Sequence, residues 1–205
     1  LSAFAVFFTQ SPSFLSHQRS LERQHGRSNA HNLFELSAIP TDNHIRKVMD
    51  ATSPEDFLGQ FRQCFELVEA HETYNRYKVL DGNILVAMDG TVHHSSSVIQ
   101  CNHCHSREIK GKGTHYFHSF VGAVLCAPGL DKVLNLEPEF VIPQDGHEKQ
   151  DCERAAAKRW LAKHGTYYGT KKAIILGDDL YACQPICEEI LDKGLSFILA
   201  FKSCH

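Results

Sequence analysis

Two short apolar runs, at residues 84–88 and 173–176, lead into the aspartates Asp89 and Asp178. No polar residue interrupts either run, which is typical of strands that are buried on both faces of a sheet. Open α/β sheets bring the carboxyl ends of parallel strands to one edge. The pattern therefore predicts a mixed α/β fold in which two carboxylates lie at one edge of the sheet.

The spacing of apolar residues divides the chain near residue 75. Before that point it is helical, with Ser11, Thr41 and Ser53 as candidate N-caps, and a stripe containing Phe61 and Phe65 is expected to pack into the core. After it, the pattern predicts strands at 84–88, 92–100 and 115–125, a helix at 147–164, a strand at 172–177, a helix at 185–194 and a strand at 195–201. We expect a helical region at 1–75, as a candidate DNA-binding or assembly region, and a β-β-β-α-β-α-β core at 76–205, in an α+β or α/β class.

Composition excludes several classes of protein. With 42% hydrophobic and 22% charged residues, the chain can bury a core, so collagen-like, coiled-coil and wholly disordered states are excluded. A net charge of −3 argues against a simple basic nucleic-acid binder. The apolar run at 4–8 is too short to span a membrane and lacks the basic start of a signal peptide. We expect a cytoplasmic protein with reduced cysteines and no membrane partner. We also expect that both ends of the chain are cut.

Asp89 and Asp178 indicate a specific chemistry if they lie close together. Two neighbouring carboxylates repel each other unless a cation lies between them, and oxygen ligands suit Mg²⁺ or Mn²⁺. Such a centre is the start of a two-metal site for phosphoryl transfer. The alternative for Asp89 is that the Asp89 and Gly90 pair forms a hairpin turn.

Several segments of the chain are similar to those of a known family, namely 7–15, 26–30, 39–47 (IPTDNHIRK), 88–91 (MDGT), 143–153 with 155–161, and 177–182 (GDDLYA). With these segments the chain resembles the DDE transposases of bacterial insertion sequences. The predicted order, with three strands in a meander, a helix and then strand-helix-strand, is that of the ribonuclease H-like core of this family. The resemblance implies a catalytic role and metal binding for Asp89 and Asp178, with Asp179 replacing a small residue of the family.

The same resemblance implies DNA transposition by metal-dependent strand cleavage and transfer at insertion-sequence ends, by a homo-oligomer if functional. The third catalytic acid of the family is a Glu on a helix after the last core strand, and nothing after residue 201 supplies it. We therefore expect an incomplete core and a truncated copy with weak or no activity.

Cysteine and histidine gather in a hairpin insertion at 93–118. A Cys-x2-Cys pair, Cys101 and Cys104, can bind one Zn²⁺ at a tight turn, and His118 or His115 could close the site. His93 or His94 is a candidate fourth ligand, and zinc held in this way would be structural. The alternative is a pair of reduced thiols beside solvated histidines.

Basic residues suggest where DNA could be contacted. Arg107, Lys110 and Lys112 surround the expected hairpin tip, and Lys158 and Arg159 lie on the helix predicted at 147–164. The alternative is that these charges are simply solvated.

Two other functions compete with transposition. Asp89-Gly90-Thr91 also resembles a motif of haloacid-dehalogenase-like phosphatases, but those enzymes need a nucleophilic Asp where this chain has Ala87. The second alternative is a non-catalytic, zinc-stabilised DNA-binding remnant.

Overall fold

The computed structural model describes residues 2–24, 32, 33, 35, 38, 40–142 and 152–201. It divides the chain into two compact units, Leu1–Phe57 and Leu58–His205. The segments 26–30 and 143–151 of the transposase resemblance, and the predicted start of a helix at 147, lie outside the described residues.

The first unit is helical. Helices α1 (Ser2–Phe8), α2 (Phe14–Arg23) and α4 (Asp42–Asp50) bury a small set of apolar side chains, including Val6, Leu21 and Ile45. The predicted cap at Thr41 is confirmed, because its side chain accepts a hydrogen bond from His44 N at 3.2 Å. The prediction for Ser11 is wrong. Ser13 caps α2 instead, and the Ser11 hydroxyl bonds to the ring of His17.

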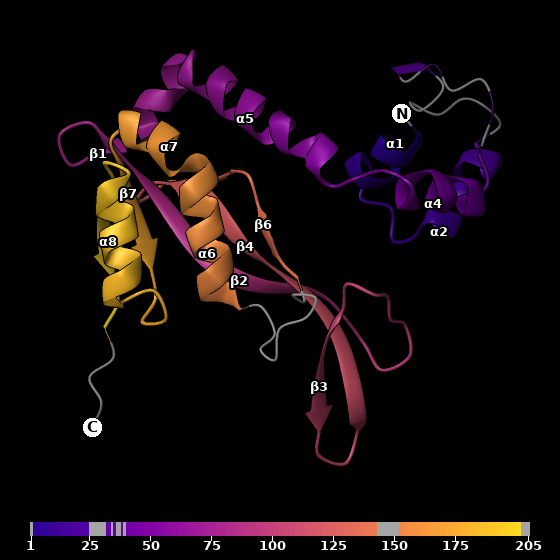
Figure 1. Cartoon of the computed structure of the whole chain (residues 1–205). Coiled ribbons are helices and arrows are strands. Elements are labelled where there is room, and N and C mark those ends of the chain that lie inside the picture. Colours follow the sequence, from indigo (N-terminus) through magenta and orange to yellow (C-terminus); the bar gives the residue numbers. More distant parts are fainter. Residues whose placement is uncertain are drawn as a thin grey trace. The chain divides into compact units, whose positions relative to one another are not determined.

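The second unit is built on a mostly antiparallel sheet whose main strand order is β3-β4-β2-β7-β8 (Figure 1). The strands are β1 (Lys78–Val79), β2 (Asn83–Ser96), β3 (His105–Ile109), β4 (Gly113–Cys126), β5 (Leu134–Asn135), β6 (Glu139–Val141), β7 (Ala173–Gly177) and β8 (Ser196–Leu199). Strands β3, β5 and β6 all pair with β4, whereas β7 runs parallel to β2 and β8 parallel to β7. The class of mixed α and β structure is as predicted.

Strand β2 is one continuous strand, whereas the sequence predicted two strands, at 84–88 and 92–100, with a break at Asp89. Asp89 pairs with Gly122 and Gly90 with Val121, so the strand continues through this point and no hairpin turn forms there. The cause is β4, whose 14 residues offer an unbroken partner and keep the pairing going beyond the apolar run. The end of β4 that pairs with β3 projects from the rest of the sheet as a hairpin (Figure 1).

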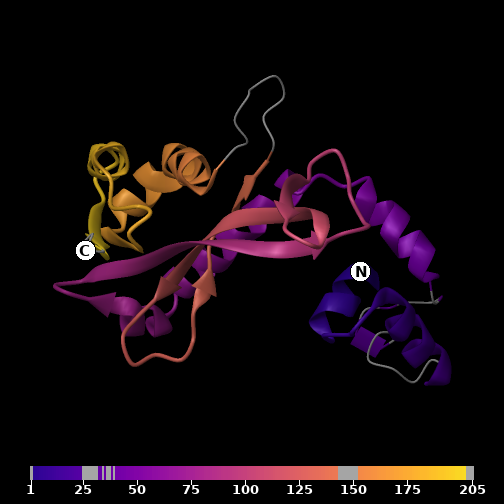
Figure 2. The ribbon, with the colours of Figure 1, turned by 90° about the horizontal axis from the view of Figure 1, so that it is seen from below.

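A continuous helical segment covers one face of this sheet. It consists of α6 (Glu153–Trp160), a π-helical turn (Leu161–Gly165) and α7 (Thr166–Thr170), so the predicted stop at Gly165 is wrong. A Cβ atom at position 165 would lie 2.8 Å from Lys193 Cγ, which explains why glycine here serves close packing rather than helix termination. Helix α8 (Gln184–Asp192) lies beside α6 on the same side of the sheet (Figure 2).

The core lies between the sheet and these helices, together with α5 (Glu55–Glu69), whose Phe65 is fully buried as predicted. Trp160 and Tyr168 stack with ring centroids 5.5 Å apart. Helix α8 begins with a proline in its first turn and buries Ile186 and Ile190, whereas Leu191 of the same helix is 58% exposed.

Buried charges in this core are paired, as burial requires. Glu137, 2% exposed, accepts hydrogen bonds from Arg62 and from the Tyr168 hydroxyl, each at 2.7 Å. Among the described residues, no helix has the length and apolar character needed to cross a membrane.

Candidate functional site

The two aspartates of the sequence pattern lie at the same end of two neighbouring parallel strands. The register pairs Ala87 of β2 with Leu176 of β7, and Asp89 and Asp178 each follow one of these paired residues by two positions. Both residues are exposed. The buried part of each strand thus fixes the position of a carboxylate that solvent can reach.

Local hydrogen bonds orient both carboxylates. Asp89 Oδ1 accepts from the backbone N–H of Gly90, and Asp178 Oδ1 accepts from that of Leu180, each at 2.9 Å. An ionised carboxylate offers about four acceptor positions, so these bonds leave capacity for a cation. The apolar strand residues position the backbone, and the short turns after them position the side chains.

A third carboxylate, Glu153, joins this edge. The Tyr181 hydroxyl donates to Glu153 Oε1 at 2.7 Å. Burial raises the pKa of Tyr181, and the hydrogen bond to Glu153 and the negative charges of Glu153, Asp89 and Asp178 raise it further. One carboxylate therefore bonds to this buried hydroxyl and two others act on it through their charge, and we call Asp89, Glu153 and Asp178 the carboxylate edge.

Sequence reasoning missed Glu153. It stands in the first turn of α6, where acidic residues are common because they favour the positive end of the helix dipole. The better signal was Gly90, since a Cβ atom there would overlap the Glu153 carboxylate. Gly90 lets this side chain lie against β2.

A cavity of about 280 Å³ opens next to the carboxylate edge. Its lining includes Gly90, Cys152 and Glu153 together with the aromatic rings of Phe117 and Phe120. It lies where the projecting hairpin joins the sheet, because Phe117 pairs with the first residue of β3. The cavity therefore adjoins both the carboxylate edge and the base of the hairpin.

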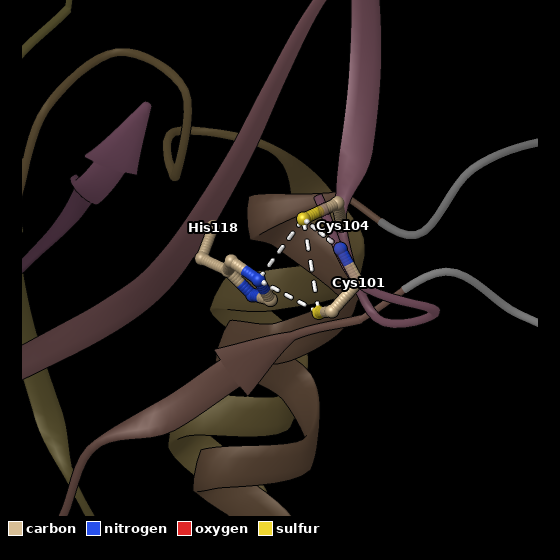
Figure 3. Close-up of side chains that lie close together, drawn as sticks. All are labelled: Cys101, Cys104 and His118. Carbon is tan, nitrogen blue, oxygen red and sulfur yellow. Dashed lines mark hydrogen bonds between the residues drawn. The ribbon is translucent and has the colours of Figure 1, made fainter. Parts of the chain in front are cut away.

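The cysteine and histidine residues form a second site, at the start of β3 (Figure 3). The two thiol sulfurs of Cys101 and Cys104 lie 3.7 Å apart, and His118 Nε2 lies 3.3 Å from the first and 3.2 Å from the second. In the described part of the chain, this is the group of three metal-ligating side chains whose ligand atoms all lie within 4.8 Å of one another. The carboxylate edge is not drawn together to that extent.

Backbone donors face both sulfurs of this cysteine–histidine group. The N–H of Cys101 donates to Cys104 Sγ at 3.3 Å, and the N–H of His103 donates to Cys101 Sγ at 3.4 Å. The turn is closed by the N–H of Cys104, which donates to the Cys101 carbonyl. The backbone donor favours the thiolate form of Cys104, but burial outweighs this effect and raises the pKa of the thiol.

The structure separates the two candidate histidines on β4. His118 joins the cysteines, whereas His115 pairs with Arg107 and lies an odd number of residues away. Successive side chains of a strand point to opposite faces, so the two histidines are on opposite sides of the sheet. His105 is 2% exposed and its Nε2 lies 3.1 Å from the Val141 carbonyl, so it belongs to the core.

Histidines 93 and 94 both lie near His118, since a β-bulge interrupts the pairing between Val92 and His94. Their ring centroids are 5.7 and 6.0 Å from that of His118. Burial lowers the pKa of His118, and the neighbouring imidazoles lower it further. Neutral imidazole is the form that ligates a metal.

The basic candidates differ in their surroundings. Arg107, Lys110 and Lys112 are exposed on the β3–β4 hairpin, and Lys158 is exposed on α6. Arg159 instead donates to Glu139 at 2.8 Å and to the Phe140 carbonyl at 2.9 Å. These contacts give Arg159 a structural role; whether any of the five touches DNA remains a prediction.

Comparisons with family models, with curated proteins and with solved structures gave no match for this chain. The carboxylate edge and the cysteine–histidine group are therefore the features that indicate a function.

Proposed function

We propose that the protein is of the DDE transposase type and acts on the DNA ends of an insertion sequence by metal-dependent strand cleavage and transfer. The observation that carries the proposal is the parallel pairing of β2 with β7, because Asp89 and Asp178 each follow a paired residue by two positions at the same end of these strands. Carboxylates on adjacent parallel strands suit divalent cations and phosphoryl transfer.

The arrangement of strands also supports the proposal. Strands β2, β4 and β6 are joined by antiparallel pairing, and β7 and β8 follow after helices and run parallel to β2. This succession agrees with the ribonuclease H-like order of the family that the sequence resembles. The extra β3 hairpin is an addition to that order.

The residues of the carboxylate edge fit Mg²⁺ or Mn²⁺ by the chemistry of their donors. Asp89 and Asp178 would hold the metal, and Glu153 bonds to Tyr181, on which the charges of both aspartates also act. Bound ions would activate a water or a 3′-hydroxyl and stabilise the leaving oxygen. The protein's own part is to position the carboxylates and to keep the Tyr181 proton in place, since the pKa of this hydroxyl is raised.

Mn²⁺ binding to the purified chain, followed by electron paramagnetic resonance, tests the proposal together with nicking of supercoiled DNA. We expect Asp89→Asn and Asp178→Asn each to weaken Mn²⁺ binding at least ~10-fold, the effect of losing a metal-supporting group, and to abolish any Mn²⁺-dependent nicking. Asp131→Asn is the matched control, because Asp131 is 82% exposed in a loop and pairs with Lys132. Equal Mn²⁺ binding by all three variants would contradict the proposal.

A second candidate function, a zinc-stabilised DNA-binding module without catalysis, is favoured by a separate observation. The cysteine–histidine group lies beside a hairpin that exposes Arg107, Lys110 and Lys112. In this function a structural Zn²⁺ would hold the hairpin in shape while the basic side chains contact phosphates. Salt-dependent DNA binding without Mn²⁺-dependent nicking would select it over the first.

A further inference from the structure

We propose that the cysteine–histidine group binds one structural Zn²⁺ in a Cys2His2 shell and that His94 is its fourth ligand. The inference rests on the zinc-stabilised hairpin of the second candidate function and is independent of catalysis at the carboxylate edge. It is argued from the spacing of the three grouped ligands and from the β-bulge in β2.

The three ligand atoms have the spacing of a tetrahedral zinc centre. With Zn–S bonds of about 2.3 Å and a tetrahedral angle, two sulfurs should lie about 3.8 Å apart, and a sulfur and a nitrogen about 3.5 Å. The Cys101 and Cys104 sulfurs are 3.7 Å apart, and each lies 3.2–3.3 Å from His118 Nε2. One face of a tetrahedron is therefore formed by the side chains alone.

The backbone prepares the same centre. Two N–H groups already donate to the sulfurs, one to each. Such donors stabilise negative charge on sulfur and hold the turn in the conformation that brings both thiolates to one ion. Two solvated thiols would be expected to bond to water rather than to these backbone donors. They would also not be expected to lie beside His118, which is on a different strand.

Four imidazoles surround His118, and three of them are poorly placed to complete the shell. His105 is buried against the Val141 carbonyl. His103 lies inside the Cys-x2-Cys turn, where its backbone N–H donates to Cys101 Sγ. The ring of His93 has its centroid 5.7 Å from that of His118, but it also packs against two phenyl rings, at 5.6 Å from Phe120 and 6.2 Å from Phe140.

His94 has the favourable position. It is the direct cross-strand partner of His118, and its ring centroid is 6.0 Å from that of His118. Directly opposed residues of antiparallel strands have Cβ atoms about 4.5–5.5 Å apart and point to the same face, so two imidazoles can reach one ion by side-chain rotation. The bulge at His93 sets this register, since without it His94 would face the other side of the sheet.

A zinc ion at this place would tie three segments together, namely β2 through His94, the turn at 101–104 and β4 through His118. The hairpin needs such a tie because it buries little apolar surface of its own. Val98 and Ile99 before the turn are 81% and 67% exposed. A metal ion supplies the folding free energy that so small a core cannot.

Metal content and Co²⁺ spectroscopy of the full chain test the inference. We expect one Zn²⁺ per chain and, after exchange, the visible absorption of tetrahedral Co²⁺ with sulfur-to-cobalt charge transfer. His94→Ala should weaken Zn²⁺ binding at least ~10-fold, and His93→Ala should leave it unchanged. His94→Cys should retain one Co²⁺ and raise the charge-transfer absorption by about one-half, since the number of thiolate ligands rises from two to three.

Each negative result of these experiments would overturn a different part of the inference. A reduced wild-type chain that takes up no Zn²⁺ overturns the zinc site itself. One Zn²⁺ per chain whose affinity and Co²⁺ spectrum do not respond to His94→Ala or His94→Cys overturns the assignment of His94, as does a loss confined to His93→Ala. Cys101→Ser is the positive control and should abolish stoichiometric binding. None of these results depends on whether the carboxylate edge binds Mn²⁺.

Discussion

The carboxylate edge and the cysteine–histidine group hold metal-binding side chains in opposite ways. At the carboxylate edge the scaffold is buried, but the carboxylates are not drawn together, and only Glu153 bonds to the Tyr181 hydroxyl. In the hairpin the ligand atoms already touch, while the surrounding segment is exposed. Like charges keep the first set apart, whereas neutral thiols and imidazole can gather without a metal. One site therefore depends on the core for its geometry, and the other depends on its own ligands.

The largest expected effect is on the core beneath the carboxylate edge. Trp160 is fully buried, stacks on Tyr168 and donates its indole N–H to the Glu137 carbonyl at 2.7 Å. We expect Trp160→Ala to lower the free energy of unfolding by about 3–5 kcal/mol, measured by urea denaturation with circular dichroism. Leu191→Ala on the exposed side of α8 should change it by less than about 0.5 kcal/mol.

The same measurement on Cys101→Ser sharpens the comparison. Cys101 is exposed, so we expect the main unfolding transition to move by less than about 0.5 kcal/mol. A loss as large as that of Trp160→Ala would show that the hairpin and the core unfold as one structure, and the contrast between the two sites would then be wrong.

Alkaline pH should weaken the core next. Tyr168 and Tyr181 are 0% and 1% exposed, and burial raises the pKa of both, with Glu137 and Glu153 respectively adding to the rise. Their pKa is about 10 in the unfolded chain. Below that pH both the folded and the unfolded chain keep these protons, so the two tyrosines do not make stability depend on pH. Above it the unfolded state loses protons that the folded state retains, so stability falls by about 1.4 kcal/mol per pH unit for each tyrosine.

Urea denaturation between pH 9 and 11.5 measures this slope. Tyr168→Phe should remove about half of the part due to the two tyrosines. A slope that is the same in the variant and in the wild type would contradict the assignment of Tyr168 as a buried, neutral hydroxyl.

A smaller effect is expected where Glu153 lies against β2. Gly90→Ala places a methyl group where the Glu153 carboxylate lies, so the side chain must move away from the carboxylate edge. We expect a loss of about 1–3 kcal/mol in the free energy of unfolding. Gly59→Ala is the matched control, because nothing lies within 4 Å of its new Cβ, and in helix α5 it should stabilise by about 0.4–1 kcal/mol. An equal response of the two variants would contradict the placement of Glu153.

The smallest expected effect concerns the basic tip of the hairpin. If Lys110 and Lys112 contact phosphates, replacing either with alanine should lower the slope of log affinity against log salt by about 0.9 for duplex DNA. Lys132→Ala, in an exposed loop beside Asp131, is the control. Fluorescence anisotropy with labelled DNA measures the slope, and an unchanged slope in both hairpin variants would remove DNA contact from this tip.

Part of this molecule was readable from local sequence. The cap at Thr41, the helix predicted at 185–194 and the buried strand predicted at 172–177 are set by neighbouring residues, so these predictions are confirmed. The grouping of Cys101 and Cys104 with a histidine of the returning strand is also confirmed, because a short chelating turn leaves little choice of geometry. Zinc itself stays a proposal, as do the catalytic role of the aspartates and the DNA partner.

The failures share a physical cause. β2 continues through Asp89 because β4 pairs with it there, and the helix continues through Gly165 because Lys193 packs against that position. In both places a partner distant in sequence overrides the local signal. Glu153 was missed for the same reason, since its role depends on Gly90 and Tyr181, which lie on other elements.

The sequence by itself determined which segments are apolar enough to be buried and which polar residues follow them, because hydrophobic burial and hydrogen-bonded turns act on neighbours along the chain. Only the tertiary structure decided which polar residues meet. Strand register chose His118 over His115 and brought Asp89 and Asp178 to the same end of two paired strands, and the packing of α6 brought Glu153 against Gly90 of β2. A shift of one residue in either pairing would reverse the faces, so the positions of both sites follow from register rather than from composition.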